Sequence, residues 1–292
     1  MTQVAGRHLA LLVAVCAVWG FNLIAIKAGV DRMPPIFFSL LRFLVLAVAV
    51  APFLRVRRGE MRWLLVASLC SGGLQFALMF VGIAHSGSMS SVAIAGQLGV
   101  PFTTLLSIAV LGEQVRWRRW TGILLSFVGV MIIGFNPVVF DSLGGLALVV
   151  LGALSGSLGL VAIKRVHDIK PLELQAWFAW TSLPVLLLLT LLLEDGQMAS
   201  LAAVDLAGAG AVLYTALAAS LFGHTAFFAM VQRYEVTSVA PITVMAPLFS
   251  VGFAVLLLGE RLDWRIVVGG IMTLGGVAII AMRERRLPDT HT

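Results

Sequence analysis

Charged residues are scarce in this chain. Only 12% of its 292 residues are Asp, Glu, Lys or Arg, whereas 60% are hydrophobic, and the mean hydropathy is +1.03. A soluble domain is about half apolar and about a quarter charged. The composition therefore excludes a soluble domain and indicates a membrane protein.

Cysteine is nearly absent too. Cys16 and Cys70 both lie inside apolar runs, where we expect them to act as small hydrophobic side chains. Two isolated cysteines provide neither a disulfide framework nor the spacing of a metal site. The sequence also lacks a Ser-His-Asp arrangement, and no Gly-Lys-Ser/Thr follows its glycine-rich stretch 144–152. We therefore predict that the protein is not an enzyme and holds no metal or cofactor.

Long apolar runs fill most of the chain. A helix that crosses the hydrocarbon core needs about 20 mostly apolar residues, and these runs lack the alternation of a membrane β-barrel. We predict an all-α integral membrane protein of ten transmembrane helices. The predicted spans are 8–29, 34–54, 62–84, 89–111, 116–135, 142–165, 171–193, 205–232, 237–258 and 264–282.

The basic residues predict the orientation. If the N-terminus is cytoplasmic, 15 of the 20 Lys and Arg residues fall in cytoplasmic segments and only three, Arg32, Arg261 and Arg265, fall outside. Cytoplasmic loops of membrane proteins carry this excess. We predict a multi-pass protein of the cell inner membrane with both termini cytoplasmic. The pI of about 10.1 then reflects topology, and no nucleic-acid partner is expected.

The chain contains an internal repeat. A shift of 147 residues aligns 91–133 with 238–280, including Leu-Gly-Glu at 111–113 and again at 258–260, and a shift of 137 aligns Ala-Ile-Lys at 25–27 with 162–164. The two halves, 1–136 and 137–292, would each hold five helices. Because five is odd, the second half must be inverted, and inverted repeats are typical of secondary transporters with a central site. A membrane receptor or scaffold is the alternative from another class.

These residues also carry a family resemblance. "WGFNLIAIK" in the first span, "PPIFFSLLRFL" in the second and the two Leu-Gly-Glu turns resemble the drug/metabolite transporter superfamily, and within it the EamA-type exporters. The chain is most similar to the aromatic and broad-range amino-acid exporters. The resemblance implies efflux of amino acids across the bilayer, with another small metabolite or drug as the alternative substrate. It is compatible with a monomer and does not settle the oligomeric state.

Polar and aromatic residues on helical stripes are the candidates for a substrate cavity. Trp19 and Asn22 share one stripe, and Gln75, Phe76 and Met79 share another. Such residues more often serve packing or interhelical hydrogen bonds when taken singly. The full candidate set is Trp19, Asn22, Arg42, Gln75, Phe76, Met79, Gln97, Trp177, Tyr214 and His224.

Arg42 and His224 are the ionisable candidates within spans. Arg42 lies about 12 Å from the outer end of its span, at 1.5 Å per residue, which is deep for snorkelling. Its guanidinium suits a carboxylate, although a structural arginine bonded to backbone carbonyls is an equal alternative. His224 is either a packing residue or a proton carrier. No Asp or Glu lies near the middle of a predicted span, which favours facilitated or weakly coupled efflux over strong proton antiport.

Two pairs of charged residues are candidates for gates. Lys27 shares the outer leaflet with Glu260, and Lys164 shares the inner leaflet with Glu113. Each pair could close one side of the pathway, although snorkelling explains the lysines as well. Prolines that interrupt spans can free backbone carbonyls to line a cavity. The predicted helix breaks are at Pro101, Pro241 and Pro247.

Overall fold

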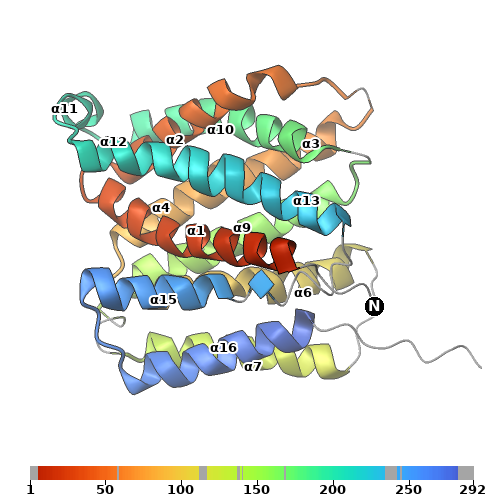
Figure 1. The fold of residues 1–292 in the computed structure, drawn as a ribbon, viewed down its shortest axis with the longest axis vertical. Helices are drawn as coiled ribbons and strands as arrows, with labels where there is room; N and C mark the ends of the chain where they lie inside the picture. The colour runs from red at the N-terminus through yellow and green to blue at the C-terminus, as the bar shows by residue number, and fades with distance from the viewer. Residues whose placement is uncertain are drawn as a thin grey trace, which may run out of the picture.

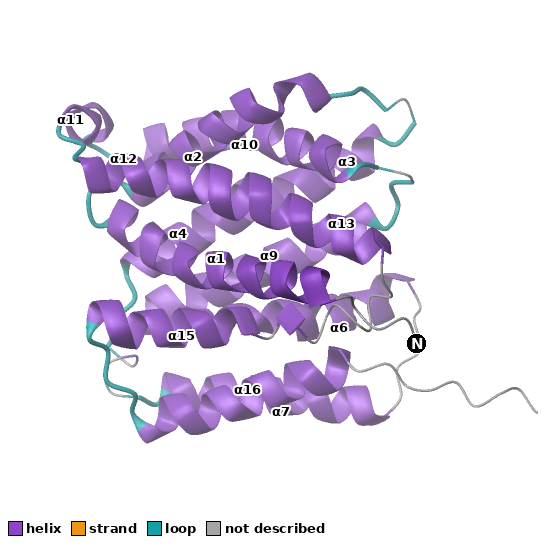
Figure 2. Cartoon of the chain, in the orientation of Figure 1, coloured by secondary structure: helices purple, strands orange, loops and turns teal. Residues whose placement is uncertain are grey.

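The fold was obtained as a computed structural model that describes residues 6–57, 59–111, 117–136, 139, 141–167, 169–233, 242–243 and 245–281. Every regular element in this part of the chain is a helix (Figure 2). The all-helical prediction is therefore confirmed for the described residues.

The helices run roughly parallel or antiparallel to one another across the molecule (Figure 1). In chain order they are α1 (Gly6–Val30), α2 (Pro35–Val50), η1 (Ala51–Phe53), α3 (Met61–Ser68), η2 (Leu69–Leu74), α4 (Gln75–Ala84), α5 (Met89–Ala95), η3 (Gly96–Leu98), α6 (Gly99–Leu111), α7 (Trp117–Gly134), α9 (Leu143–Ile163), α10 (Pro171–Leu193), α11 (Gln197–Ala202), α12 (Leu206–Leu213), η4 (Tyr214–His224), α13 (Thr225–Arg233), α15 (Met245–Leu258) and α16 (Trp264–Ala281).

Seven helical stretches are long and apolar enough to cross a membrane. They are Gly6–Val30, Pro35–Phe53, Met61–Ala84, Met89–Val110, Leu143–Ile163, Pro171–Leu193 and Leu206–Phe227. Three shorter apolar helices, Trp120–Gly134, Met245–Leu258 and Trp264–Ile280, fall within the other three predicted spans. The structure thus has the helices of a multi-pass membrane protein, while the count of ten spans in two inverted repeats stays a prediction.

The chain enters several helices through residues suited to that role. Pro35 and Pro171 lie in the first turns of α2 and α10, where the missing N–H of proline costs nothing. Ser88 caps α5 by accepting a hydrogen bond from the Ser91 amide at 3.2 Å, and Asp205 caps α12 by accepting one from the Gly208 amide at 2.7 Å. These caps satisfy backbone amides in the first turns of α5 and α12.

The helix ends and the turns gather at two opposite ends of the bundle. The α11 end, on the left in Figure 1, carries α11 and the turns at 31–34, 85–88, 194–196 and 259–263. The N-terminal end, on the right, carries the start of α1 and the turns at 54–60 and 164–170. Under the orientation predicted from the basic residues, the N-terminal end would face the cytoplasm.

The largest apolar cluster fills the half of the bundle nearest the α11 end. Its members include Ile26 near the end of α1, Phe38 at the start of α2, Phe80 in α4 and Val92 in α5. Phe38 and Phe80 stack with ring centroids 5.3 Å apart. Two smaller clusters, around Leu12 and around Trp177, lie toward the N-terminal end. The largest share of the buried apolar packing therefore lies at the α11 end, although a further cluster runs along α2 and α10 toward the N-terminal end.

α7 and α16 form a close pair at one side of the bundle (Figure 1). Glycines allow the approach: a Cβ on Gly122 would meet the Gly276 carbonyl, and one on Gly269 would meet the Gly129 carbonyl. Small residues at such positions let membrane helices pack backbone to backbone. Neither helix contributes a lining residue to the cavities described next.

Candidate functional site

Two adjoining cavities lie in the middle of the bundle. The central cavity measures about 290 Å³, and the second, of about 250 Å³, extends from it toward the N-terminal end between α9 and α10. They share the lining residues Arg42, Gln75, Phe76, Gly96, Ala153 and His224. Together they approach the volumes typical of small-molecule sites.

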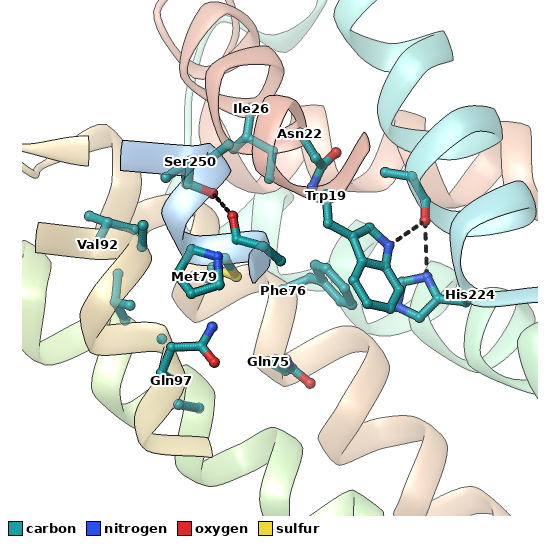
Figure 3. Close-up of a pocket in the computed structure, with 18 of the residues that line it drawn as sticks. Trp19, Asn22, Ile26, Gln75, Phe76, Met79, Val92, Gln97, His224 and Ser250 are labelled. Carbon is teal, nitrogen blue, oxygen red and sulfur yellow. Dashed lines mark hydrogen bonds between the residues drawn. The ribbon is translucent and has the colours of Figure 1, made fainter. Parts of the chain in front are cut away.

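Most of the predicted cavity residues come together here. Figure 3 shows Trp19, Asn22, Gln75, Phe76, Met79, Gln97 and His224 around the central cavity, and Arg42 and Pro247 line it as well. They come from α1, α2, α4, η3, η4 and α15, which are far apart in the sequence. The side chains of these helical stripes therefore line one cavity, while their part in binding a substrate stays a prediction.

Trp177 and Tyr214 do not line either cavity, contrary to expectation. The Trp177 indole Nε1 donates to the Arg55 carbonyl at 2.9 Å and its ring packs on Leu64 in a separate cluster. The Tyr214 hydroxyl donates to the Val18 carbonyl at 3.0 Å. Buried Trp and Tyr commonly use their polar atoms in this way, so both residues tie helices together.

Two π-helical segments border the cavities. η2 ends directly before Gln75, and η4 ends at His224. Within η4 the wider turn lets the Ser220 hydroxyl donate to the Thr215 carbonyl, five residues earlier, at 2.7 Å. Such segments are rare and occur often at functional sites. Here they adjoin two polar residues that line the central cavity, Gln75 and His224.

Trp19 and His224 meet at one backbone carbonyl. The Trp19 Nε1 and the His224 Nδ1 each lie 3.1 Å from the Ala219 oxygen, as the dashed lines in Figure 3 mark. A carbonyl oxygen only accepts, so His224 donates through Nδ1. The two ring centroids also lie 5.2 Å apart, with the ring planes tilted by 51°. These contacts hold both side chains against the cavity wall.

Arg42 is the dominant charge of the site. Its side chain is 2% exposed, and its Nε and Nη2 donate to the Ser220 hydroxyl at 3.2 and 2.7 Å. Its Nη1 is buried without a hydrogen-bond partner. The guanidinium carbon lies 4.1 Å from the centroid of the Phe76 ring, a cation–π contact. Arg42 thus contacts aromatic rings and one hydroxyl, and it forms no ion pair with any residue that the structure describes.

The remaining polar lining residues are neutral amides, hydroxyls and the imidazole. Among the described lining residues they are Asn22, Ser71, Gln75, Gln97, Ser157, Gln175, Ser220, His224 and Ser250, and none is acidic. The described part of the chain likewise holds no cluster of three His, Cys, Asp or Glu side chains that could bind a metal ion. The site can therefore bind polar groups and an anion.

The outer gating pair predicted from the sequence is not formed. Lys27 Nζ pairs instead with Asp31 Oδ1, one helical turn away, at 2.6 Å. The Glu260 carboxylate instead accepts hydrogen bonds from residues at the start of α5. At the other end, Lys164 Nζ donates to the Ser107 hydroxyl at 3.3 Å. Its predicted partner Glu113 lies outside the described residues.

Glu260 joins the end of α15 to the start of α5. Its carboxylate accepts hydrogen bonds from the Met89 amide, from the Ser90 amide at 3.0 Å and from the Ser88 hydroxyl at 3.2 Å. Gly259 has φ +66°, which favours glycine and ends α15 with the turn that directs Glu260 to this position. The Leu-Gly-Glu motif at 258–260 is therefore a helix end coupled to a carboxylate cap on another helix.

Two of the three predicted helix breaks, Pro101 and Pro247, lie within the described residues. Pro101 lies in the first turn of α6, directly after the 3₁₀ turn η3 at Gly96–Leu98, so this span is interrupted beside the cavity. Pro247 lies in the first turn of α15, is buried and lines the central cavity. Pro241 lies outside the described residues. Both placed prolines occur where a helix begins, which tolerates the missing N–H.

Sequence reasoning missed two contributors to the site. The Ser220 hydroxyl accepts hydrogen bonds from Arg42, but a serine in an apolar span does not by itself indicate a functional site. The small residues Ala153 and Gly156 of α9 form a wall of the cavities. A Cβ at Gly156 would collide with the Gln75 side chain, so the small-residue pattern of this helix also admits a polar side chain.

Known transporters match this chain in sequence over nearly its whole length. The model of the EamA-like transporter family matches residues 6–135 and again residues 143–282. A Salmonella typhimurium protein named probable amino-acid metabolite efflux pump is 30% identical over 289 residues, covering 95% of this chain and 96% of that protein. An Escherichia coli K12 protein of the same name is 28% identical over 284 residues, covering 93% of each.

A solved crystal structure has the same fold. It superposes with a TM-score of 0.63 at 16% sequence identity and covers 94% of this chain and 96% of its own. At this identity the likeness concerns the fold alone. The family assignment therefore rests on the sequence matches.

Proposed function

Since this chain belongs to the EamA-like transporter family, we propose that it exports amino acids across the cytoplasmic (inner) membrane by alternating access. The substrates would span a broad range and include aromatic and apolar side chains. The names of the two efflux-pump relatives support the amino-acid class. The breadth of the range is supported by the cavity alone.

The observation that carries the proposal is the buried guanidinium of Arg42 in a cavity otherwise lined by amides and apolar surface. A guanidinium binds a carboxylate through charge-assisted hydrogen bonds, which are stronger than neutral ones. Phe76, Met79 and Trp19 provide apolar surface for a side chain. Apolar walls with a few placed polar groups are the usual form of a small-molecule site.

The packing of the two ends supports an alternating mechanism. The large apolar cluster closes the α11 end, whereas the cavities extend toward the N-terminal end. With the N-terminus in the cytoplasm, this arrangement corresponds to a cavity directed inward. Rocking of the inverted halves 1–136 and 137–292 about the central cavity would exchange its exposure.

Transport would be facilitated or only weakly coupled to protons. Intramembrane carboxylates commonly serve as proton relays, and the described lining residues include none. Among the described lining residues, the His224 imidazole is the neutral side chain best suited to take up a proton. Weak coupling would therefore pass through His224.

The test is flux in proteoliposomes. Purified protein would be reconstituted, and the release of a panel of labelled amino acids would be followed with and without a pH gradient. We expect release of several apolar or aromatic amino acids that is little changed by the gradient. Vesicles that release no amino acid faster than protein-free vesicles would refute the proposal, and accumulation driven by the gradient would refute the uncoupled mechanism.

A further inference from the structure

The described residues that line the cavity carry a positive charge and no negative one. Arg42 is permanently charged, because a guanidinium does not lose its proton in proteins. The described residues that line the two cavities include no carboxylate to neutralise it. A buried charge without an ionic partner is costly, so a ligand that brings one negative charge removes a cost already present in the empty site.

One nitrogen of the buried Arg42 guanidinium, Nη1, is free to take an acceptor. Nε and Nη2 share the single hydroxyl of Ser220, while Nη1 is buried with no acceptor. A carboxylate placed beside the guanidinium would satisfy Nη1 and supply the counter-charge in one step. The Phe76 ring covers one face of the guanidinium at 4.1 Å, which leaves recognition to its edge.

The groups that could receive an ammonium are weaker partners. Asn22, Gln75 and Gln97 can each offer a neutral amide oxygen, and that of Asn22 is itself buried without a hydrogen-bond partner. A hydrogen bond from an ammonium to an amide is useful, but it does not neutralise the charge. An ammonium would also share the cavity with Arg42, and like charges repel.

We infer that the cavity recognises the carboxylate of its ligand and not the ammonium, so that amino-acid derivatives lacking the amine bind at least as well as the parent amino acids. This inference rests on the proposed function and deepens it. The ligand class becomes monocarboxylates with an apolar or aromatic side chain, of which α-amino acids are one group. Amines and amino-acid amides, which lack the carboxylate, are poor ligands.

The experiment compares three ligands of nearly equal size. Leucine is a zwitterion at pH 7, 4-methylpentanoate lacks its amine and is an anion, and leucinamide lacks its carboxylate and is a cation. Binding to the full-length protein in nanodiscs would be measured from the concentration dependence of the thermal unfolding temperature, since a ligand of the folded state raises it. This readout requires no transport.

We expect 4-methylpentanoate to bind at least as tightly as leucine, and leucinamide to bind about tenfold or more weakly, because hydrogen bonds to a charged partner contribute about 1.5–3 kcal/mol. In Arg42→Gln the three affinities should become similar. Asn22→Asp provides a second variant that retains Arg42 and adds a carboxylate to the same cavity. It should remove the advantage of the anion, whereas Asn22→Ala, the matched control, should preserve it.

Two results would overturn the inference. One is equal binding of leucinamide and 4-methylpentanoate to the native protein, and the other is an unchanged preference in both Arg42→Gln and Asn22→Asp. If leucine efflux persists while leucinamide binds equally well, this inference fails and the proposed function stands. If none of the three ligands binds, the inference also fails, and the flux panel alone decides whether amino acids are exported.

Discussion

The two ends of the bundle are packed differently. At the α11 end, side chains from α1, α2, α4, α5, α7, α9, α12, α15 and α16 join one apolar cluster, and Glu260 caps α5. Toward the N-terminal end the described residues form smaller clusters beside a cavity, and the ion pair of Arg57 with Glu173, at 2.6 Å, links the turn after η1 to the first turn of α10. One end is closed by buried apolar surface, and the other is held in part by an ion pair whose Glu173 carboxylate is buried.

The difference separates the source of stability from the source of function. Close packing at the α11 end holds the helices together, because packing contacts rather than hydrophobic transfer stabilise helix association in lipid. The cavity instead retains a buried cation with an unpartnered nitrogen and two π-helical segments. These features cost stability and are found where function requires them.

The largest expected effect is on stability at the closed end. Phe38→Ala removes a fully buried ring that stacks on Phe80, and should lower the free energy of unfolding by about 4 kcal/mol, the cost of a large-to-small change in a packed core. Phe178→Ala is the matched control, because Phe178 lines the second cavity and is only partly buried. Thermal unfolding in nanodiscs measures both. Equal losses would contradict the proposed difference between the ends.

Arg42→Gln should show the opposite pattern. Efflux of leucine at low concentration should fall about a hundredfold, because the charged hydrogen bonds to the carboxylate are lost. The unfolding temperature should stay the same or rise, since a buried charge without an ionic partner is removed. Arg42→Lys should recover part of the flux. A variant that loses stability and flux together would indicate that Arg42 is structural.

Much of this arrangement could be predicted from the sequence. The long apolar runs predicted the helices, because only a few residue types are tolerated over such lengths in lipid. Stripes of polar residues at helical spacing gave Asn22, Gln75 and Gln97, because a polar side chain in a span faces the protein interior far more often than lipid. Arg42 was found by its depth in the membrane for the same reason.

The rest could not be predicted, because lipid-facing and core-facing surfaces are both apolar. α10 is apolar on every side, so its pattern does not reveal that Trp177 faces a separate cluster. The π-helical segments depend on tertiary packing, and no residue type in η4 indicates a π-helix from the sequence alone. The partner of Glu260 is the backbone of another helix, which carries no sequence signal.

Glu260 offers a smaller effect that sharpens the comparison. Glu260→Gln weakens the cap on α5, which should favour opening of the α11 end about fivefold, since such a cap contributes about 1 kcal/mol. Ser250→Cys, in a background with Cys16 and Cys70 replaced by Ala, places a thiol in the central cavity. Labelling by a membrane-impermeant maleimide from the outer side should be faster in the Glu260→Gln variant.

Glu194→Gln is the matched control for that experiment. Glu194 also caps a helix at the α11 end, accepting from the Ile36 and Phe37 amides of α2 at 2.7 and 2.9 Å. It follows α10, which packs along α2, so loss of its charge leaves the contact of α15 with α5 intact. Labelling should be unchanged. Faster labelling in both variants would mean that any lost cap loosens this end, and that Glu260 has no special part in closing it.

The smallest expected effect is at Lys27. Its ion pair with Asp31 is partly exposed and local to one turn of α1, and such pairs contribute about 0.2–1 kcal/mol. Lys27→Ala should therefore leave flux within about twofold of the native protein and leave maleimide labelling of Ser250→Cys unchanged. The charge swap of Lys27 with Glu260 should be no better than Glu260→Lys alone, because the two side chains have separate partners. Rescue by the swap would instead show that they pair in a conformation other than this one, and would restore Lys27 as part of the outer gate.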